Sequence, residues 1–152
     1  MKVVPFAITR LTGAGKNTVT KLLVDAGRAS AAYQDRVLRH LPSKRIQVDE
    51  IWSFVQVKHL NMAKAKVVSR DAGDVWTWVA LDADTKLIAS FYIGDRGYGA
   101  AREFIDDLAE RLANRVQLTS DGHRAYLKAV GEAFGGRHRL CDVSEDIRAG
   151  SF

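Results

Sequence analysis

Cysteine, proline and long apolar runs are scarce in this chain, and each scarcity excludes a class of protein. Cys141 is the only cysteine among 152 residues, so no disulfide can form within the chain and no cysteine-based zinc motif is present. No stretch of about 18 apolar residues occurs, and the first residues lack the pattern of a secretory signal. With 47% apolar residues, we expect a soluble, cytoplasmic protein that forms one domain, or a small domain plus an appendage, with a core of its own.

Acidic residues are rare at the front of the chain. Residues 1–48 contain nine Lys and Arg but only Asp25 and Asp35, a net charge of +7, whereas the other 104 residues carry −2. A basic front end is typical of a surface that contacts nucleic acid, because neutralised phosphates release counterions. A solvated basic face without a partner explains the charge equally well.

The stretch "TGAGKNTVTKLL" is similar to a phosphate-binding loop at first sight. A Walker loop requires Gly five positions before Gly15 and a hydroxyl residue directly after Lys16. Arg10 and Asn17 occupy these positions. The dinucleotide fingerprint fails as well, since Gly does not recur three residues after Gly15. We therefore expect no nucleotide cofactor.

A helix-turn-helix explains this stretch better. Residues 13–15 form a Gly-containing turn, and a short helix follows, with Asn17 or Thr18 as its cap and Gly27 at its end. Val19, Leu22 and Leu23 are expected to pack inward. The side chains expected to face DNA are Lys16, Asn17, Thr18, Lys21 and Arg28. An ordinary capped surface helix is the alternative, and a further helix is expected before Pro42.

From Lys44 the pattern changes to strands. Alternating, β-branched and aromatic residues predict a three-strand antiparallel meander joined by turns, with a basic loop at 58–73. A helix with Phe104, Ile105, Leu108 and Leu112 on one face follows, then a short strand and a second helix. The predicted elements are strands 45–57, 75–82 and 87–93, helix 99–115, strand 116–120 and helix 123–134. The sequence thus predicts a mixed α/β core.

Two acidic residues of this predicted core are candidate metal ligands. Asp49 lies within the first strand among apolar neighbours, where a carboxylate requires a partner such as a cation. Asp121 follows the fourth strand. If that strand lies beside the first, the two carboxylates meet and can hold Mg²⁺. Glu50 could equally be the ligand, and His123 is either a supporting contact or the start of a helix.

The tryptophans of the meander are expected to pack in the core rather than to stack on bases. Trp76 and Trp78 share one face by the alternation of a strand, and Trp52 lies on the first strand.

The segments "TGAGKNTVTKLLVDAG", "RIQVDEIWSFV", "GDVWTWVALDADTKLI" and "RVQLTSDGHRAYL" closely resemble the DDE transposases of the insertion-sequence-one type. The resemblance covers residues 8–135 and implies a ribonuclease-H-like fold, with Asp49 and Asp121 as the first two metal-binding catalytic acids. It also implies a Mg²⁺ (or Mn²⁺) cofactor, double-stranded DNA of transposon ends and target as partner, a location at the nucleoid, and possible homo-oligomers.

The sequence departs from that family at its end. The third acid, a Glu on a downstream helix, has no counterpart, since the later acids Glu132, Asp142, Glu145 and Asp146 lie outside the family's motif. We expect residues 1–44 to form a partial helix-turn-helix, 45–136 an incomplete catalytic core, and 137–152 an out-of-frame tail. Such a chain would bind metal weakly and lack strand transfer. The alternatives are a non-catalytic DNA-binding fragment or an inert remnant.

Overall fold

The computed structural model describes residues 3–65, 69–121, 123–135 and 142–145. The chain forms two compact units, Met1–Leu38 and Arg39–Phe152, so the first unit ends before the predicted boundary at Lys44. The elements are α1 (Val3–Thr12), α2 (Lys16–Val37), β1 (Arg45–Val55), the 3-10 helix η1 (His59–Lys64), β2 (Gly73–Asp82), β3 (Ile88–Gly94), α3 (Tyr98–Arg111), β4 (Gln117–Ser120), α4 (Arg124–Gly135) and β5 (Asp142–Glu145).

The first unit is a pair of helices joined by a tight turn. Gly13 adopts a φ of 73°, which glycine tolerates without strain, and its N–H donates to the Thr9 carbonyl. The predicted turn at 13–15 is therefore confirmed, and a helix, not a strand, precedes "GAGK". This order is incompatible with a Walker loop, in which a strand enters the glycine turn.

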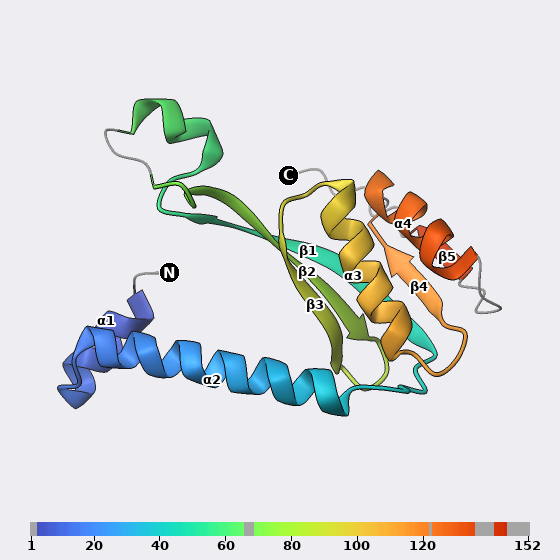
Figure 1. Cartoon of the computed structure of the whole chain (residues 1–152), viewed down its shortest axis with the longest axis horizontal. Coiled ribbons are helices and arrows are strands. Elements are labelled where there is room, and N and C mark those ends of the chain that lie inside the picture. The colour runs from blue at the N-terminus through green and yellow to red at the C-terminus, as the bar shows by residue number, and fades with distance from the viewer. Residues whose placement is uncertain (1–2, 66–68, 122, 136–141, 146–152) are drawn as a thin grey trace. The chain divides into compact units, whose positions relative to one another are not determined.

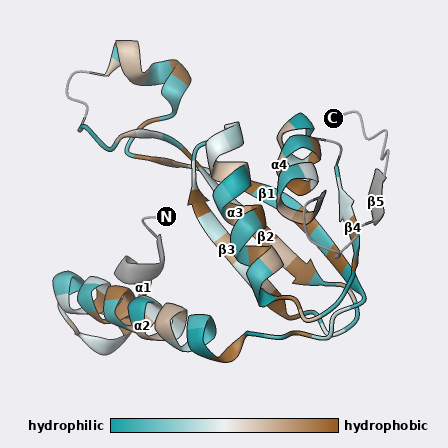
Figure 2. Cartoon of the chain, turned by 45° about the vertical axis from the view of Figure 1, so that its right-hand side comes forward, coloured by the Kyte–Doolittle hydropathy of each residue, from teal (hydrophilic) through white to brown (hydrophobic). Residues whose placement is uncertain are grey.

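Helix α2 differs from the prediction in three respects. It continues through Gly27 to Val37, because one glycine between the good helix formers Ala26 and Arg28 costs only about 1 kcal/mol. Gly15 occupies the cap position without a side-chain cap, so the predicted caps Asn17 and Thr18 are wrong. Leu22 and Leu23 are exposed rather than packed, and Figure 2 shows apolar and hydrophilic residues distributed around the whole helix.

The second unit is built on a five-stranded sheet in the order β3-β2-β1-β4-β5. β1, β2 and β3 form the predicted antiparallel meander. β4 pairs in parallel with β1, and β5 in parallel with β4. Helices α3 and α4 lie side by side over one face of the sheet (Figure 1). The predicted mixed α/β core is confirmed.

The core lies between this face and the two helices. Phe104, Ile105, Leu108 and Leu112 are all completely buried, as predicted. Trp78 is buried at the centre, where its ring meets those of Phe104 and Tyr126 at centroid distances of 6.1 and 5.3 Å. Its indole N–H donates to the Asp95 carbonyl at 2.9 Å, so burial leaves no unpaired donor.

β1 and β2 extend beyond the helices as a long hairpin arm, with η1 near its far end (Figure 1). The predicted basic loop therefore contains one 3-10 helix. α3 and α4 do not cover the arm, so side chains on its face toward the helices are open to solvent there. Trp52 is 39% exposed, so the prediction that it packs in the core is wrong, whereas the prediction for Trp78 is confirmed.

The segment predicted to be an out-of-frame tail supplies β5 at Asp142–Glu145. The other tail residues, 137–141 and 146–152, lie outside the described residues. A frameshift origin stays a prediction, which the nucleotide sequence tests. Among the described residues, no helix combines the length and the apolar character that crossing a lipid bilayer requires.

Candidate metal centre

Three carboxylates meet where β1 and β4 run side by side. The parallel register pairs Gln47 with Thr119, so two residues further along each strand Asp49 comes opposite Asp121. Asp49, Glu50 and Asp121 each offer a carboxylate oxygen within 4.8 Å of the others. The expected meeting of Asp49 and Asp121, which lie 72 positions apart in the sequence, is confirmed. Glu50, the alternative ligand, joins them rather than replacing one.

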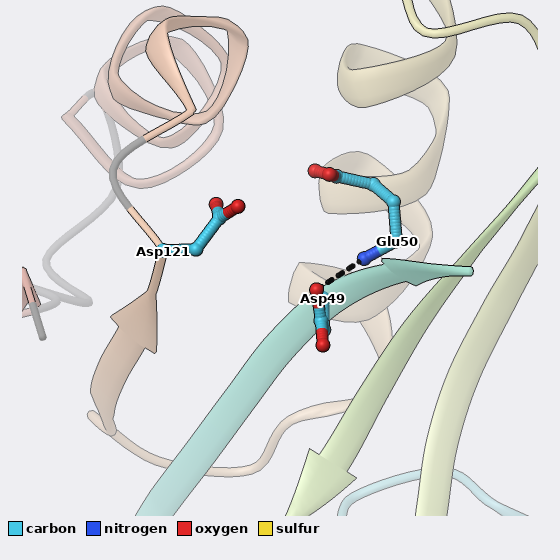
Figure 3. A group of neighbouring side chains, drawn as sticks. All are labelled: Asp49, Glu50 and Asp121. Atoms are coloured by element: carbon cyan, nitrogen blue, oxygen red, sulfur yellow. Dashed lines mark hydrogen bonds between the residues drawn. The ribbon is translucent and has the colours of Figure 1, made fainter. Parts of the chain in front are cut away.

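Asp49 is not buried, contrary to the sequence prediction. Alternation along β1 directs Ile46 and Val48 into the core, and it directs Asp49 to the opposite face, where it is exposed. One Asp49 carboxylate oxygen accepts the Glu50 backbone N–H at 2.8 Å. Figure 3 shows that Asp49 and Glu50 leave the strand in opposite directions, while Asp121 points toward β1 from the end of β4. Asp49 is therefore held in place without a desolvation cost.

Glu50 is the buried member of the group. Its side chain is 2% exposed, and Oε2 lies 3.4 Å from Nη2 of Arg96. Oε1 is buried and has no hydrogen-bond partner among the described residues. Leaving such an acceptor unsatisfied costs about 1–3 kcal/mol, and more for a charged group. An unpaired, buried carboxylate oxygen beside two other carboxylates fits a bound cation.

Tyr126 of α4 adds a hydroxyl to the same place. Burial and then the negative charge of Glu50 raise the pKa of Tyr126 above its usual range, so the hydroxyl keeps its proton at neutral pH. No hydrogen bond of normal geometry involves this hydroxyl among the described residues, but its interaction with Glu50 contributes to the raised pKa. The hydroxyl is therefore placed to donate to the buried Glu50 carboxylate. Sequence reasoning did not identify Tyr126 or Arg96.

The aspartates are reached from the face of the sheet opposite α3 and α4. An open cleft of about 470 Å³ lies there, with Asp49 and Asp121 in its wall. The other walls are mostly apolar side chains of β1, β2 and β3, among them Ile51, Val79 and Ile88. A ligand in this cleft would meet two carboxylates, apolar surface from β1, β2 and β3, and the polar residues Gln47, Thr119 and Ser120.

His123 supports the turn after β4. Its backbone N–H donates to the Asp121 carboxylate at 3.2 Å, and its Nδ1 accepts the Ala125 N–H at 3.1 Å in the first turn of α4. His123 both directly precedes α4 and contacts Asp121, so the structure is compatible with both alternatives for this residue. The turn fixes Asp121, whose carboxylate points toward β1 (Figure 3).

The predicted DNA-contacting residues belong to the first unit. They are all exposed on α2, namely Lys16, Asn17, Thr18, Lys21 and Arg28. Lys21 forms an ion pair with Asp25 at 2.5 Å, so part of its charge is compensated within the helix. Their role in DNA binding stays a prediction.

The three carboxylates form a donor set of hard oxygens, which Mg²⁺ and Mn²⁺ prefer over soft ligands. Asp49 and Asp121 are accessible and anionic, and the unpaired Glu50 oxygen would complete a third position. Comparison of the sequence with models of protein families and with curated proteins finds no match.

Proposed function

We propose that this chain is a catalytically incomplete DNA transposase of the insertion-sequence-one type, whose ribonuclease-H-like core acts on phosphodiesters in the cytoplasm but lacks the family's third acid and with it strand transfer. The observation that carries the proposal is the meeting of Asp49 and Asp121 at neighbouring strands, from sequence motifs 72 positions apart. The strand order, with an antiparallel meander and β4 parallel to β1, supports the fold assignment.

The exposed and the buried residues of the site would have different roles. Asp49 and Asp121 border the cleft and would hold Mg²⁺ or Mn²⁺, with Glu50 as the buried third carboxylate. When bound, such an ion activates water or a DNA 3′-hydroxyl and neutralises charge at the scissile phosphate. Tyr126, whose hydroxyl stays protonated, would donate to Glu50 and hold the orientation of its carboxylate.

The direct test is nicking of a duplex that carries a matched transposon end, with Mg²⁺ or Mn²⁺ present. Nicking should require the ion and should be lost in Asp49→Asn and in Asp121→Asn. Asp106→Asn is the matched control, because Asp106 is an exposed acid on α3 that pairs with Arg102. Nicking that survives both Asp49→Asn and Asp121→Asn would exclude the proposal. Joined products are a second readout, and the sequence predicts that none form.

The second candidate function is DNA binding without chemistry. The ion pair between Arg96 and Glu50 favours this candidate. Arg96 neutralises the charge of the third carboxylate within the protein, so that carboxylate has less need of a metal ion. This candidate predicts salt-sensitive binding to transposon ends that weakens in the double variant Lys16→Ala, Lys21→Ala, with a reduction of the salt slope of up to about 0.9 per lost phosphate contact. Asp49→Ala should bind unchanged. Binding that does not respond to the lysine substitutions would exclude α2 as the contact.

A further inference from the structure

An aromatic stripe with two cations runs along the hairpin arm next to the carboxylates. We define it as Trp52, Phe54, Trp76, Lys58 and Arg96. Trp52 and Phe54 follow Glu50 on the same face of β1, since alternate residues share a face and lie about 6.8 Å apart along a strand. Trp76 is the cross-strand partner of Trp52. The stripe therefore begins at the buried carboxylate and continues onto the part of the arm beyond the helices.

The rings of Trp52 and Phe54 are open and lie close together, whereas Trp76 is half-buried against the core, as predicted. Trp52 and Phe54 are 39% and 46% exposed, and their centroids lie 5.7 Å apart at an interplanar angle of 36°. Exposed neighbouring aromatic rings cost free energy in water that packing against a partner recovers. A core position would have covered them, as it covers Trp78.

Two cations lie over these rings. Lys58 Nζ is 4.8 Å from the Trp52 centroid and 5.8 Å from that of Phe54, and Arg96 Cζ is 4.6 Å from Trp76. Arg96 also reaches Glu50, so it connects the stripe to the carboxylate group. Asp74 faces Phe54 across the strands, and its carboxylate accepts the His59 N–H at 3.0 Å.

The arm as a whole adds positive charge. Its connecting segment 56–72 contains four Lys and Arg, Lys58, Lys64, Lys66 and Arg70, against one acid, Asp71. Positive side chains that accompany exposed aromatic rings are the combination by which proteins hold single-stranded nucleic acid, with bases on the rings and phosphates on the cations. Paired bases in a duplex cannot present a face to a ring in this way.

We propose that the aromatic stripe binds an unpaired strand of DNA, whose bases replace the Lys58 ammonium over Trp52 and Phe54 and whose phosphates pair with Lys58 and Arg96. A strand in this position follows the face of β1 that carries Glu50, whereas Asp49 and the cleft lie on the opposite face of the sheet. The choice of DNA rests on the proposed function, whereas the stacking rests on the stripe alone. The stripe thus supplies a site for strands that are already separated next to the carboxylates.

The test is fluorescence anisotropy of the full chain with labelled oligothymidylate of about 15 nucleotides and with a duplex of the same length. The buffer contains EDTA, which removes any contribution of metal. Trp52→Ala should weaken binding of the single strand by about 5- to 150-fold, the range for one lost stacked base, and change duplex binding much less. Phe91→Ala is the matched control, because Phe91 is 42% exposed on the opposite face of the sheet.

Two further variants separate stacking from loss of structure. Trp52→Phe keeps a ring and should retain most of the single-strand affinity, whereas Trp52→Leu keeps apolar area without a ring and should lose it as Trp52→Ala does. Equal binding by Trp52→Leu and the parent chain would overturn the proposal, as would absence of single-strand binding by the parent chain. Single-strand binding without metal-dependent nicking would exclude the proposed function and leave the stripe intact.

Discussion

Glu50→Gln should raise the stability of the metal-free protein and abolish its response to Mg²⁺. The parent side chain is 2% exposed and has one buried oxygen without a hydrogen-bond partner among the described residues. Gln removes the buried charge and provides an N–H₂ group that can pair with the Tyr126 hydroxyl. Arg96, which loses its ion-pair partner, remains solvated because 45% of its side chain is exposed.

The expected gain follows from the cost of an unsatisfied buried group. Recovering about 1–2 kcal/mol of that cost raises the melting temperature by about 2–8 °C for a chain of this size. Added Mg²⁺ should reduce this difference in melting temperature, because it stabilises the parent chain and not the variant. If the parent site binds Mg²⁺ with a dissociation constant of about 1 mM, about 10 mM Mg²⁺ stabilises it by about 1.4 kcal/mol, which corresponds to about 3–6 °C.

The assay is thermal unfolding followed by circular dichroism, with and without Mg²⁺. Asp49→Asn separates the two effects, since Asp49 is exposed and its substitution should change metal-free stability by less than about 0.5 kcal/mol while removing the Mg²⁺ response. A Glu50→Gln variant that is less stable than the parent chain without metal, or that keeps the full Mg²⁺ shift, would contradict the role given to Glu50.

Three further predictions concern the fold. Trp78→Ala should lower the free energy of unfolding by about 3–5 kcal/mol in urea titrations, and a loss below 1 kcal/mol would contradict its central position. Burial raises the pKa of Asp107, but the hydrogen bonds from Arg111 and Ser90 together outweigh it, so the pKa is lowered in the folded state. The contribution of Asp107 to stability is therefore present above the unfolded pKa near 3.9 and disappears as pH falls through the lower folded pKa. Asp107→Asn should flatten this loss of stability in urea titrations between about pH 2 and 5. Gly27→Ala, with open space around the added Cβ, should stabilise α2 by about 0.4–1 kcal/mol, whereas Gly13→Ala, at φ of 73°, should destabilise the turn; helicity at 222 nm measures both.

The sequence predicted most elements of the second unit because its strands alternate and its helices have one apolar face. The same patterns do not tell which part of a face is covered. Trp52 and Trp78 both fit core positions, yet only Trp78 lies beneath α3 and α4. Which side of a strand is buried depends on distant segments, and a local pattern contains no information on where those segments end.

The candidate site was predicted in outline but not in detail. Asp49 appeared buried because its neighbours are apolar, although Ile46 and Val48 face the other side. The alternation contained a usable signal for Glu50, since a charged residue in phase with two core positions must be paired, ligated or protonated. Arg96 and Tyr126 come from other elements, so only the tertiary structure could bring them to the site.

The parallel pairing of β4 with β1 has a consequence for folding kinetics. Because the intervening chain contains β2, β3 and α3, the two strands can join only after a long loop has closed, a slow step in chains with distant contacts. Asp49 and Asp121 are therefore far apart in any intermediate that lacks β4. A cation that bridges them would bind after this step, and would prolong the lifetime of the native state without accelerating its formation.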